Sequence, residues 1–496
     1  MDMIQTLCVS LLLPLLIFIL MKKSRQNRNL RLPPGPRRLP ILGNMHQLSE
    51  WPHRSLDSLA KIHGPLMYLK LGSIPVLAVS SADMAREIIK DHDLDFTGRP
   101  AGAASRKLSY GCRDIVFSPY GEYWRHIRKI CVQELLSSQR VQSFRSLRQR
   151  EVERMIQRVA TSKGPINMSE LLLSLTNSII CYAAFGTTYG GTGGRFQGIM
   201  GDSKAVIIGL GVTDFLPSLE WINDLNGYRR KLDEVFRSLD GFFEEIIEEH
   251  SDPRRPPPGH EDFIDVMLRV QKEANQGPPL SRNNIKAVIM DMFLAGTDTT
   301  FATLIWAMTE FVRNPKVMRK AQDEVRKVTE GKKKVEEDDL HKLDYLKLVL
   351  KEVLRLHPPV PLLVPRECTQ LCQINGYDIP LKTRVMVNVW SIMRDPNCWD
   401  KPEEFIPERF SDASLDFRGQ NFQYIPFSSG RRSCPGLSFG LATLELALAS
   451  LLYSFDWSLP DGIQKEDMDM REAPGLALQK KTDLFLVATP RMEARP

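Results

Sequence analysis

Five long segments of the sequence repeat apolar residues at the period of an α-helix. They cover residues 81–92, 121–136, 227–250, 285–315 and 344–356. An apolar stripe with a period of about 3.6 residues marks a helix that buries one face. Shorter alternating runs at 65–80, 372–380 and 383–390 lie between turn residues and indicate strands. The sequence therefore predicts a mainly α fold with small β-sheets, of the α+β class.

The length of 496 residues exceeds that of most single hydrophobic cores, so the chain forms either several domains or one unusually large fold. Hydrophobic residues make up 43% and charged residues 25%, a composition that excludes a disordered chain. The segment "DPRRPPPGHED" at 252–262 is the best candidate for a linker. Because the helical pattern resumes directly after it, we favour an exposed loop between two helices over a domain boundary.

The N-terminus carries an apolar run from Met3 to Met21, which as a helix would span about 28 Å. A cluster of lysines and arginines follows directly, and such a charge bias keeps the rest of the chain in the cytosol. The start "MDMIQT" lacks the positive charge of a cleaved signal peptide. We expect a single-pass anchor at residues 1–21, a basic and proline-rich hinge at 22–50, and a cytosolic body at 51–496.

Two local patterns that often carry chemistry are incomplete. "YGGTGG" lacks the Lys-Ser/Thr of a P-loop and the third glycine of a dinucleotide fingerprint, so a redox reaction would receive its electrons from another protein. "CTQLC" holds Cys368 and Cys372, and no second pair follows to complete a zinc clamp. The eight cysteines show no paired spacing, and a cytosolic body keeps them reduced.

The stretch "FSSGRRSCPG" at 427–436 places Cys434 just before a strongly apolar helix. The positive end of the helix dipole and the charges of Arg431 and Arg432 favour a thiolate at this position. Gly430 and Gly436 would let a flat ligand approach the backbone closely. Read locally, such a thiolate is equally usable as a metal ligand or as a nucleophile.

The segment "LAGTDTT" at 294–300 interrupts an apolar helix with Gly296, which costs about 1 kcal/mol relative to alanine. Thr299 lies four residues after Ala295, so its hydroxyl can bond back to the Ala295 carbonyl and loosen the helix into a groove beside Asp298. The competing explanation is helix packing through small residues.

Three further motifs are weak when each is read alone. "KEVLR" places Glu352 and Arg355 on one face of a helix, where an ion pair can form. "PERF" carries Arg409 some fifty residues later, and "WRHIR" puts Trp124 and Arg128 one helical turn apart.

Together these motifs resemble the cytochrome P-450 monooxygenases, in the order and spacing of that family. "FSSGRRSCPG" matches the haem-binding pattern Phe-x-x-Gly-x-Arg-x-Cys-x-Gly without departure. With the anchor and the "PPGP" hinge, the resemblance covers essentially the whole chain and is nearest to the plant A-type microsomal enzymes of the seventy-one clan. It implies a single large cytochrome P-450 fold, with the haem-binding catalytic domain at 51–496.

The resemblance implies haem b (iron protoporphyrin IX) with Cys434 as the axial thiolate ligand of its iron. Phe427, Gly430 and Gly436 would belong to the loop that packs against the haem. The haem propionates would be bound by Trp124, Arg128, Arg366 and Arg432. Glu352, Arg355 and Arg409 would form a structural triad that fixes the haem loop.

For the reaction, the resemblance gives Thr299 and Asp298 the handling of protons. It lines the substrate pocket with Leu294, Ala295, Leu363, Val364 and Leu476. The mainly apolar lining favours a hydrophobic plant specialised metabolite, such as a terpenoid, a steroid-like compound or an alkaloid, into which one oxygen atom of O2 is inserted. Electrons would come from NADPH through cytochrome P-450 reductase, with cytochrome b5 as a second candidate donor, at the endoplasmic reticulum membrane. No nucleic-acid partner is expected.

Two alternatives stay open. One is a haem-thiolate isomerase or dehydratase that acts without O2, and the other is a membrane-anchored haem-binding protein without catalysis. The intact "AGTDTT" segment argues against both, because neither function needs a proton relay beside the haem.

Overall fold

The structure is a computed structural model of the 496-residue chain. It describes residues 30–187, 195–208, 212–255, 259–273, 278–412, 414–473, 475 and 477–491. The expected anchor at 1–21 and the first part of the hinge lie outside the described residues.

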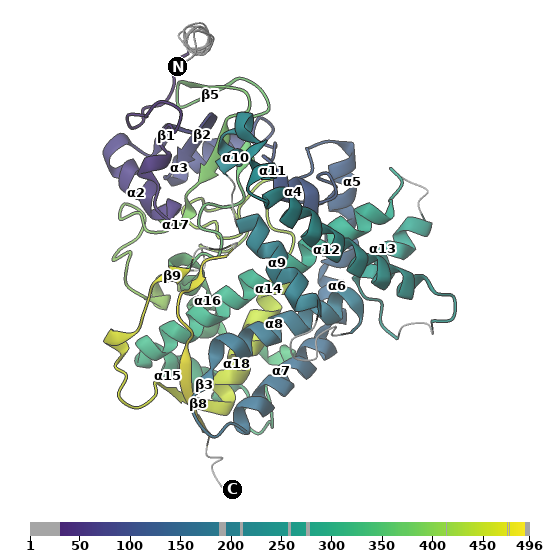
Figure 1. Cartoon of the computed structure of the whole chain (residues 1–496). Helices are drawn as coiled ribbons and strands as arrows, with labels where there is room; N and C mark the ends of the chain where they lie inside the picture. The colour runs from purple at the N-terminus through teal and green to yellow at the C-terminus, as the bar shows by residue number, and fades with distance from the viewer. Residues whose placement is uncertain are drawn as a thin grey trace, which may run out of the picture.

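Helices make up most of the described chain, as the periodicity predicts (Figure 1). The α-helices are α2 (Pro52–His63), α3 (Ala82–Arg86), α4 (Ala103–Leu108), α5 (Glu122–Ile130), α6 (Ser138–Ser143), α7 (Arg145–Ala160), α8 (Met168–Phe185), α9 (Arg195–Ile208), α10 (Val212–Phe215), α11 (Ile222–Leu225), α12 (Tyr228–Ser251), α13 (Phe263–Lys272), α14 (Arg282–Arg313), α15 (Pro315–Val328), α16 (Asp344–Leu356), α17 (Val389–Ile392) and α18 (Leu437–Ser454).

Short helical turns complete the helical part. The 3-10 turns are η1 (Met45–Gln47), η4 (Pro217–Leu219), η5 (Glu337–Lys342), η6 (Pro407–Phe410) and η7 (Lys465–Asp467). The π-helical turns η2 (Glu87–Asp91) and η3 (Cys131–Leu135) continue α3 and α5, so these two predicted helices widen at their C-terminal ends.

The strands form four small sheets. One has the order β1-β2-β7-β4, and the others pair β3-β11-β8, β5-β6 and β9-β10. The strands are β1 (Leu66–Leu71), β2 (Ile74–Val79), β3 (Ile166–Asn167), β4 (Arg366–Glu367), β5 (Cys372–Ile374), β6 (Tyr377–Ile379), β7 (Arg384–Val387), β8 (Phe455–Ser458), β9 (Glu472–Ala473), β10 (Gln479–Lys480) and β11 (Phe485–Pro490). All three predicted strand segments form strands, and the mainly α architecture is confirmed.

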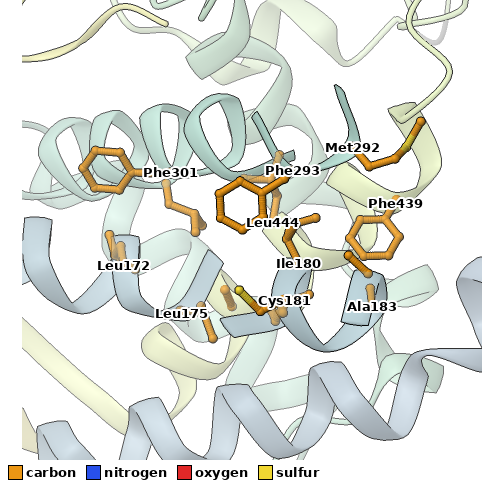
Figure 2. Packing of buried hydrophobic residues seen from close by; sticks show 14 of the residues in the cluster. Leu172, Leu175, Ile180, Cys181, Ala183, Met292, Phe293, Phe301, Phe439 and Leu444 are labelled. Carbon is orange, nitrogen blue, oxygen red and sulfur yellow. The ribbon is translucent and has the colours of Figure 1, made fainter. Parts of the chain in front are cut away.

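Three apolar helices, α8, α14 and α18, form the centre of the largest hydrophobic core (Figure 2). Ile180, Phe293 and Leu444 meet there, each with at most 4% of its surface exposed. A Cβ atom added to Gly296 would lie 2.5 Å from Cδ1 of Ile180. Packing through a small residue therefore explains this glycine, and the close approach of α8 fixes one wall beside the middle of α14.

The same three helices are long and apolar enough to cross a membrane, when only the described residues are searched. Between 56% and 72% of each apolar window is buried inside the protein. Their hydropathy thus reflects a core position. The "DPRRPPPGHED" segment lies between α12 and α13, as the loop interpretation expects, and Nε2 of His250 contacts the Asp262 carboxylate at 2.8 Å near its two ends.

Candidate haem-thiolate site

The loop from Phe427 to Gly436 presents the Cys434 sulfur at the N-terminal end of α18. The Cys434 N–H donates to the Phe427 carbonyl at 3.0 Å, and the N–H groups of Gly436 and Leu437 donate to the Cys434 sulfur. Gly430 has a φ of +70°, and a Cβ there would lie 2.8 Å from the Ile89 carbonyl oxygen. Gly430 is thus required by the loop's own turn and its contact with η2. This differs from the expectation that it makes room for a ligand.

Cys434 lines a cavity of about 260 Å³ and is exposed to it. Of the site residues that the sequence predicts, those that line this cavity are Arg128, Ala295, Thr299, Leu363, Val364, Phe427, Arg432, Cys434 and Gly436. Leu294 instead packs against the hydrophobic core, because its position on α14 turns it away from the cavity. Leu476 lies outside the described residues. Ile180 and Phe263 also line the cavity, and no motif in the sequence marks them.

Three guanidinium groups gather on the cavity wall: Arg99, Arg128 and Arg432. Burial, together with the charges of Arg366, Arg432 and Arg128, lowers the pKa of Arg99. Burial, then the charges of Arg366 and Arg128, lowers the pKa of Arg432 to about 10. The Nε of Arg99 is buried and has no hydrogen-bond partner within the described part of the chain. Crowded, incompletely paired cations of this kind favour a ligand that carries carboxylates.

Trp124 and Arg366 do not line the cavity, and both donate hydrogen bonds to other residues of the protein. The Trp124 indole N–H donates to the Ile115 carbonyl at 3.0 Å, and the Arg432 guanidinium lies 4.3 Å from the centre of the Trp124 ring. Arg366 pairs with Asp93 at 2.8 Å and donates to the Ser429 carbonyl. Through these contacts both residues support the wall, and their binding of the propionates stays a prediction.

The electrostatics of the thiol also differ from the expectation. Burial raises the pKa of the Cys434 thiol, while the Gly436 N–H and Arg128 lower it only in part. The sequence predicts that Arg431 and Arg432 favour a thiolate. In the structure, Arg431 pairs with Asp93 at 2.8 Å, and Arg432 donates to the carbonyls of Thr97 and Ser118. Without a bound metal the buried sulfur favours the protonated form, and coordination to a cation would supply the stabilisation of the thiolate.

The α14 groove forms as the spacing predicts. Thr299 Oγ1 donates to the Ala295 carbonyl at 2.7 Å, which confirms this contact, and Thr299 faces the same cavity as Cys434. Asp298 is buried and forms an ion pair with Lys204 of α9 at 2.5 Å. The hydroxyl and the carboxylate thus lie on different faces of α14, and Lys204, whose side chain is 23% exposed, connects the acid to the outside.

The family profile described as Cytochrome P450 matches residues 33–487. The chain belongs to the cytochrome P450 family. Among curated relatives, it is 51% identical to Cytochrome P450 71A9 of Glycine max over 480 residues, with 96% of each chain covered. It is 49% identical to strychnine-11-hydroxylase of Strychnos nux-vomica, covering 96% of this chain and 95% of that one. It is 46% identical to premnaspirodiene oxygenase of Hyoscyamus muticus, with 97% of each chain covered.

Solved structures agree with this assignment. A zebra fish cytochrome P450 with progesterone has a TM-score of 0.76 and 25% identity, with 88% of this chain and 99% of that chain covered. A second zebra fish structure, with abiraterone, has a TM-score of 0.74 and 25% identity, with 89% and 100% covered. The protein is therefore a cytochrome P450 monooxygenase of the plant seventy-one clan that uses cysteine-ligated haem.

The residues of the cavity fit a haem. The mainly apolar lining, the Cys434 thiol and the guanidinium groups of the wall suit the flat ring, the iron and the two carboxylates of that cofactor. The orphaned Nε of Arg99 is the clearest sign, because a buried donor without a partner is rare in native proteins. We expect Cys434 to hold the iron and Arg99, Arg128 and Arg432 to hold the propionates.

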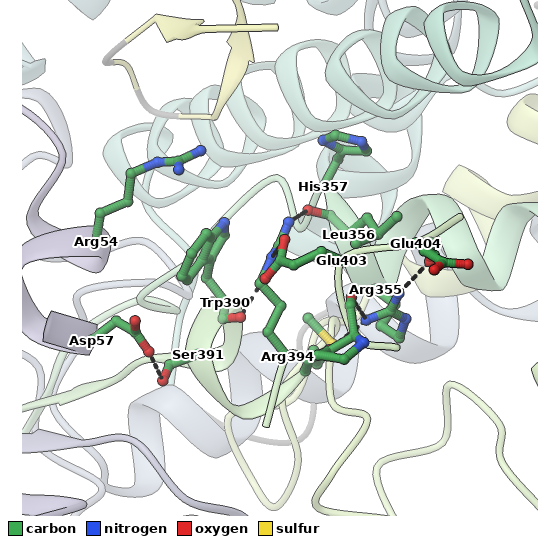
Figure 3. Close-up of polar contacts among 12 residues, drawn as sticks. Arg54, Asp57, Arg355, Leu356, His357, Trp390, Ser391, Arg394, Glu403 and Glu404 are labelled. Atoms are coloured by element: carbon green, nitrogen blue, oxygen red, sulfur yellow. Dashed lines mark hydrogen bonds and ion pairs between the residues drawn. The ribbon is translucent and has the colours of Figure 1, made fainter. Parts of the chain in front are cut away.

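The Glu352, Arg355 and Arg409 side chains of this P450 meet in one buried network. Glu352 accepts from Arg355 at 2.7 and 2.9 Å and from Arg409 at 3.0 Å, and both Glu352 and Arg355 are fully buried. Arg355 also donates to the carbonyls of Met393, Pro402 and Glu404, the last of which is drawn in Figure 3. The network therefore attaches the segment 393–410, which leads into the thiolate loop, to α16.

A carboxyl pair joins the loop 114–118 to α14 on the cavity wall. Asp291 accepts from the N–H groups of Ile115 and Val116 at 2.9 and 3.3 Å. The charge of the buried Asp114 carboxyl acts on that of Asp291. Burial raises the pKa of Asp114 from 3.8 to about 6, and burial and then the charge of Asp114 raise the pKa of Asp291 well above its usual value. The pair therefore holds its protons to higher pH than two free carboxyl groups would.

This pair predicts a pH-dependent loop. A carboxyl whose pKa is raised by folding stabilises the folded arrangement fully below its unfolded pKa and loses that contribution as pH rises through the folded value. We therefore expect hydrogen exchange at the Ile115 and Val116 amides, corrected for the intrinsic rate, to accelerate about tenfold between about pH 5 and about pH 7.5. In Asp114→Asn the charge of Asp114 no longer acts on Asp291, so the acceleration should become smaller and shift to lower pH. An unchanged pH profile in the variant would contradict the assignment.

Proposed function

We propose that this P450 inserts one oxygen atom of O2 into a hydrophobic plant specialised metabolite while anchored in the endoplasmic reticulum membrane. The observation that carries the proposal is the position of Thr299. Its hydroxyl bonds to the Ala295 carbonyl and faces the cavity that holds the Cys434 sulfur. A mobile hydroxyl at that position is what oxygen activation needs, because protons must reach the oxygen before the reaction can proceed.

When bound, the haem supplies the oxygen activation and the oxygen-transfer chemistry. The chain supplies the positions and the protons. The Thr299 hydroxyl can release the Ala295 carbonyl and turn its O–H into the cavity. Asp298 draws protons from solvent through the face of α14 where it contacts Lys204, so that α9 controls proton entry. Leu363, Val364, Ile115 and Val116 surround the substrate side with apolar groups.

The substrate class rests on that apolar lining and on the relatives. Beyond Asp291, the arginines and the hydroxyls of Thr and Ser residues, the described residues that line the cavity are mainly apolar, which favours a hydrophobic skeleton held by shape. Relatives named for strychnine and for premnaspirodiene support an alkaloid or a terpenoid, with a steroid-like compound as a third candidate.

Surface features support the membrane anchor. Ile41, Trp221 and Leu225 are exposed at 74%, 57% and 77%. The turn that holds Ile41 and the α10–η4 segment both bond to the tip of the β1–β2 hairpin, on the side where the described chain begins (Figure 1). Exposed apolar side chains on this side of the protein suit contact with lipid next to the anchor proposed at 1–21.

A positively charged surface supports electron supply by NADPH-cytochrome P-450 reductase, with cytochrome b5 as a second donor. Arg125 and Lys129 of α5 and Arg431 are exposed, and Arg128 of the same helix donates to the Ser433 carbonyl beside the thiol. An acidic partner docked on these cations would lie on the sulfur side of the cavity.

Thr299→Ala should uncouple electron consumption from product. Loss of the hydroxyl removes a positioned proton donor, which typically contributes 100-fold or more, and we expect product formed per NADPH to fall by at least about tenfold. NADPH consumption and substrate-binding spectra should persist. Thr299→Ser is the matched control, since it keeps the hydroxyl. Equal coupling in Thr299→Ala and the wild type would contradict the role of Thr299.

The function itself is tested with the full-length protein, reductase and lipid vesicles. Alkaloids, terpenoids and steroids are screened by binding spectra, and bound compounds are then incubated with NADPH and isotopically labelled O2. One labelled oxygen atom in the product supports the proposal. A product formed without NADPH or without label would instead identify an isomerase or dehydratase. If the protein neither binds nor oxidises any compound in the presence of reductase, the non-catalytic alternative is favoured.

A further inference from the structure

Two thiols that the reaction does not use lie in contact at the edge of the small sheet. The sulfur atoms of Cys368 and Cys372 are 3.8 Å apart. Cys368 follows β4 directly and is fully buried, while Cys372 begins β5 and is half-buried between two exposed residues, Leu371 and Gln373. One sulfur thus lies in the protein and its neighbour reaches the surface.

The backbone around the pair is fixed from both sides. The Cys368 N–H donates to the Thr383 carbonyl at 2.9 Å, and its carbonyl accepts from Lys382 at 2.8 Å. Cys372 pairs with Ile379 across the β5–β6 hairpin. The residues between the cysteines are also attached, since Thr369 donates through its N–H to the Asp95 carbonyl at 2.8 Å. The two sulfurs are therefore held together by the fold.

A metal clamp does not explain the pair. Among the described residues, the one cluster of His, Cys, Asp and Glu with metal-binding spacing is His250, Asp262 and Asp265, on other helices. A thiol pair without further ligands is poorly suited to hold zinc, which takes four ligands in structural sites.

We propose that Cys368 and Cys372 form a reversible intramolecular disulfide, an oxidative modification site on the cytosolic body of this P450. Closure requires the two sulfurs to approach by about 1.8 Å, from contact to a bond of about 2.0 Å. Rotation of the half-buried Cys372 side chain toward Cys368 supplies that approach, while the backbone of both residues keeps its hydrogen bonds.

The chemistry balances with a peroxide or a disulfide as the oxidant. Hydrogen peroxide oxidises the accessible Cys372 sulfur to a sulfenic acid and releases water. The Cys368 sulfur attacks Cys372, the S–S bond forms, and a second water leaves with the Cys368 proton. With glutathione disulfide, Cys372 first forms a mixed disulfide, and the attack by Cys368 releases the second glutathione. In each route the pair loses two protons and two electrons.

The exposure of Cys372 selects it for the first step, and the ionisation of the pair favours Cys368 as the attacking sulfur in the second. A hydrogen bond from Cys372 lowers the pKa of Cys368, although burial opposes the shift. The hydrogen bond to Cys368 and burial raise the pKa of Cys372. Cys368 is thus the better nucleophile of the two, and it is the sulfur that no large oxidant can reach.

The sequence provides a direct readout. Trypsin cleaves after Arg366 and after Lys382, so both cysteines fall in the single peptide 367–382, which contains no third cysteine. The haem-loaded full-length protein is equilibrated with reduced or oxidised glutathione, denatured in acid, alkylated and digested. Without oxidant the peptide should carry two alkyl groups. With excess oxidised glutathione most of it should carry none, weigh two hydrogen atoms less, and return to the alkylated form after treatment with dithiothreitol.

Two comparisons make the outcome decisive. The exposed Cys398 is an internal reference. The paired thiols should be oxidised at an at least about tenfold lower ratio of oxidised to reduced glutathione than this one, because their proximity gives each a high effective concentration for the other. Cys372→Ser keeps the buried Cys368 and therefore the fold, which its carbon monoxide spectrum verifies; in it the loss of two hydrogens must be abolished. A wild-type peptide that keeps both alkyl groups, or that carries glutathione instead of losing two hydrogens, would overturn the proposal.

Discussion

Cys434→Ala abolishes the red-shifted Soret band that the reduced protein gives with carbon monoxide. That band reports a thiolate on the haem iron, and Cys434 is the one thiol among the described residues that line the cavity. We expect monooxygenase turnover to fall by at least about 100-fold, because loss of the ligand itself exceeds the 10- to 100-fold effect of losing a group behind it. The measurement is the carbon monoxide difference spectrum of purified protein, together with product formation.

Cys398→Ala is the matched control, since Cys398 is also a single thiol but lies at an exposed position. It should keep both the band and the activity. The haem content of each variant is measured by its pyridine complex, so that loss of cofactor and change of ligand are distinguished. A normal thiolate band in Cys434→Ala would refute the assignment of the iron ligand.

Glu352→Ala destabilises the protein by about 3–5 kcal/mol, the effect of removing one partner from a buried ion pair. The variant leaves Arg355 with a fully buried charge, and Ile406 also loses its acceptor, since its N–H donates to Glu352 at 2.9 Å. Because this network holds the segment that leads to the thiolate loop, we expect the haem to be lost at lower temperature. The measurement is thermal unfolding followed by the Soret band and by circular dichroism.

Glu170→Ala is the matched control, because Glu170 is 73% exposed and lies 3.9 Å from Arg158. An exposed pair of this kind contributes less than about 1 kcal/mol. Glu352→Gln is the second variant, since it keeps the shape of the side chain and removes only its charge. Equal stability of Glu352→Ala and Glu170→Ala would show that the triad has no structural role.

Local spacing predicted the contacts that depend on one helix. The four-residue separation of Ala295 and Thr299 and the three-residue separation of Glu352 and Arg355 each define neighbours on a helix surface, and both contacts are present. The "PERF" motif supplied Arg409 only through the family pattern, because the fold brings it to Glu352 from 57 residues away.

The sequence could not show which group takes each donor. The motifs marked Trp124 and Arg366, but they could not show that the Ile115 carbonyl and the Asp93 carboxylate accept from these residues, because both acceptors lie outside the motifs. Arg99 carries no motif, and only its position beside Arg128 and Arg432 in the folded chain marks it as a binding group. Of the two adjacent residues on α14, Ala295 faces the cavity and Leu294 packs against the core.

The peptide group of Ile115 touches both halves of the site. Its carbonyl accepts from Trp124 at 3.0 Å and from Arg432 at 3.2 Å, and its N–H donates to Asp291 at 2.9 Å. The same peptide group thus contacts both the arginine wall that we expect to bind the haem propionates and the α14 wall beside the substrate. We therefore expect protein produced with too little haem to bind substrates with altered affinity. In a ligand screen on protein that lacks part of its haem, the measured affinities would reflect a disordered Ile115 segment as well as the fit of each compound to the cavity.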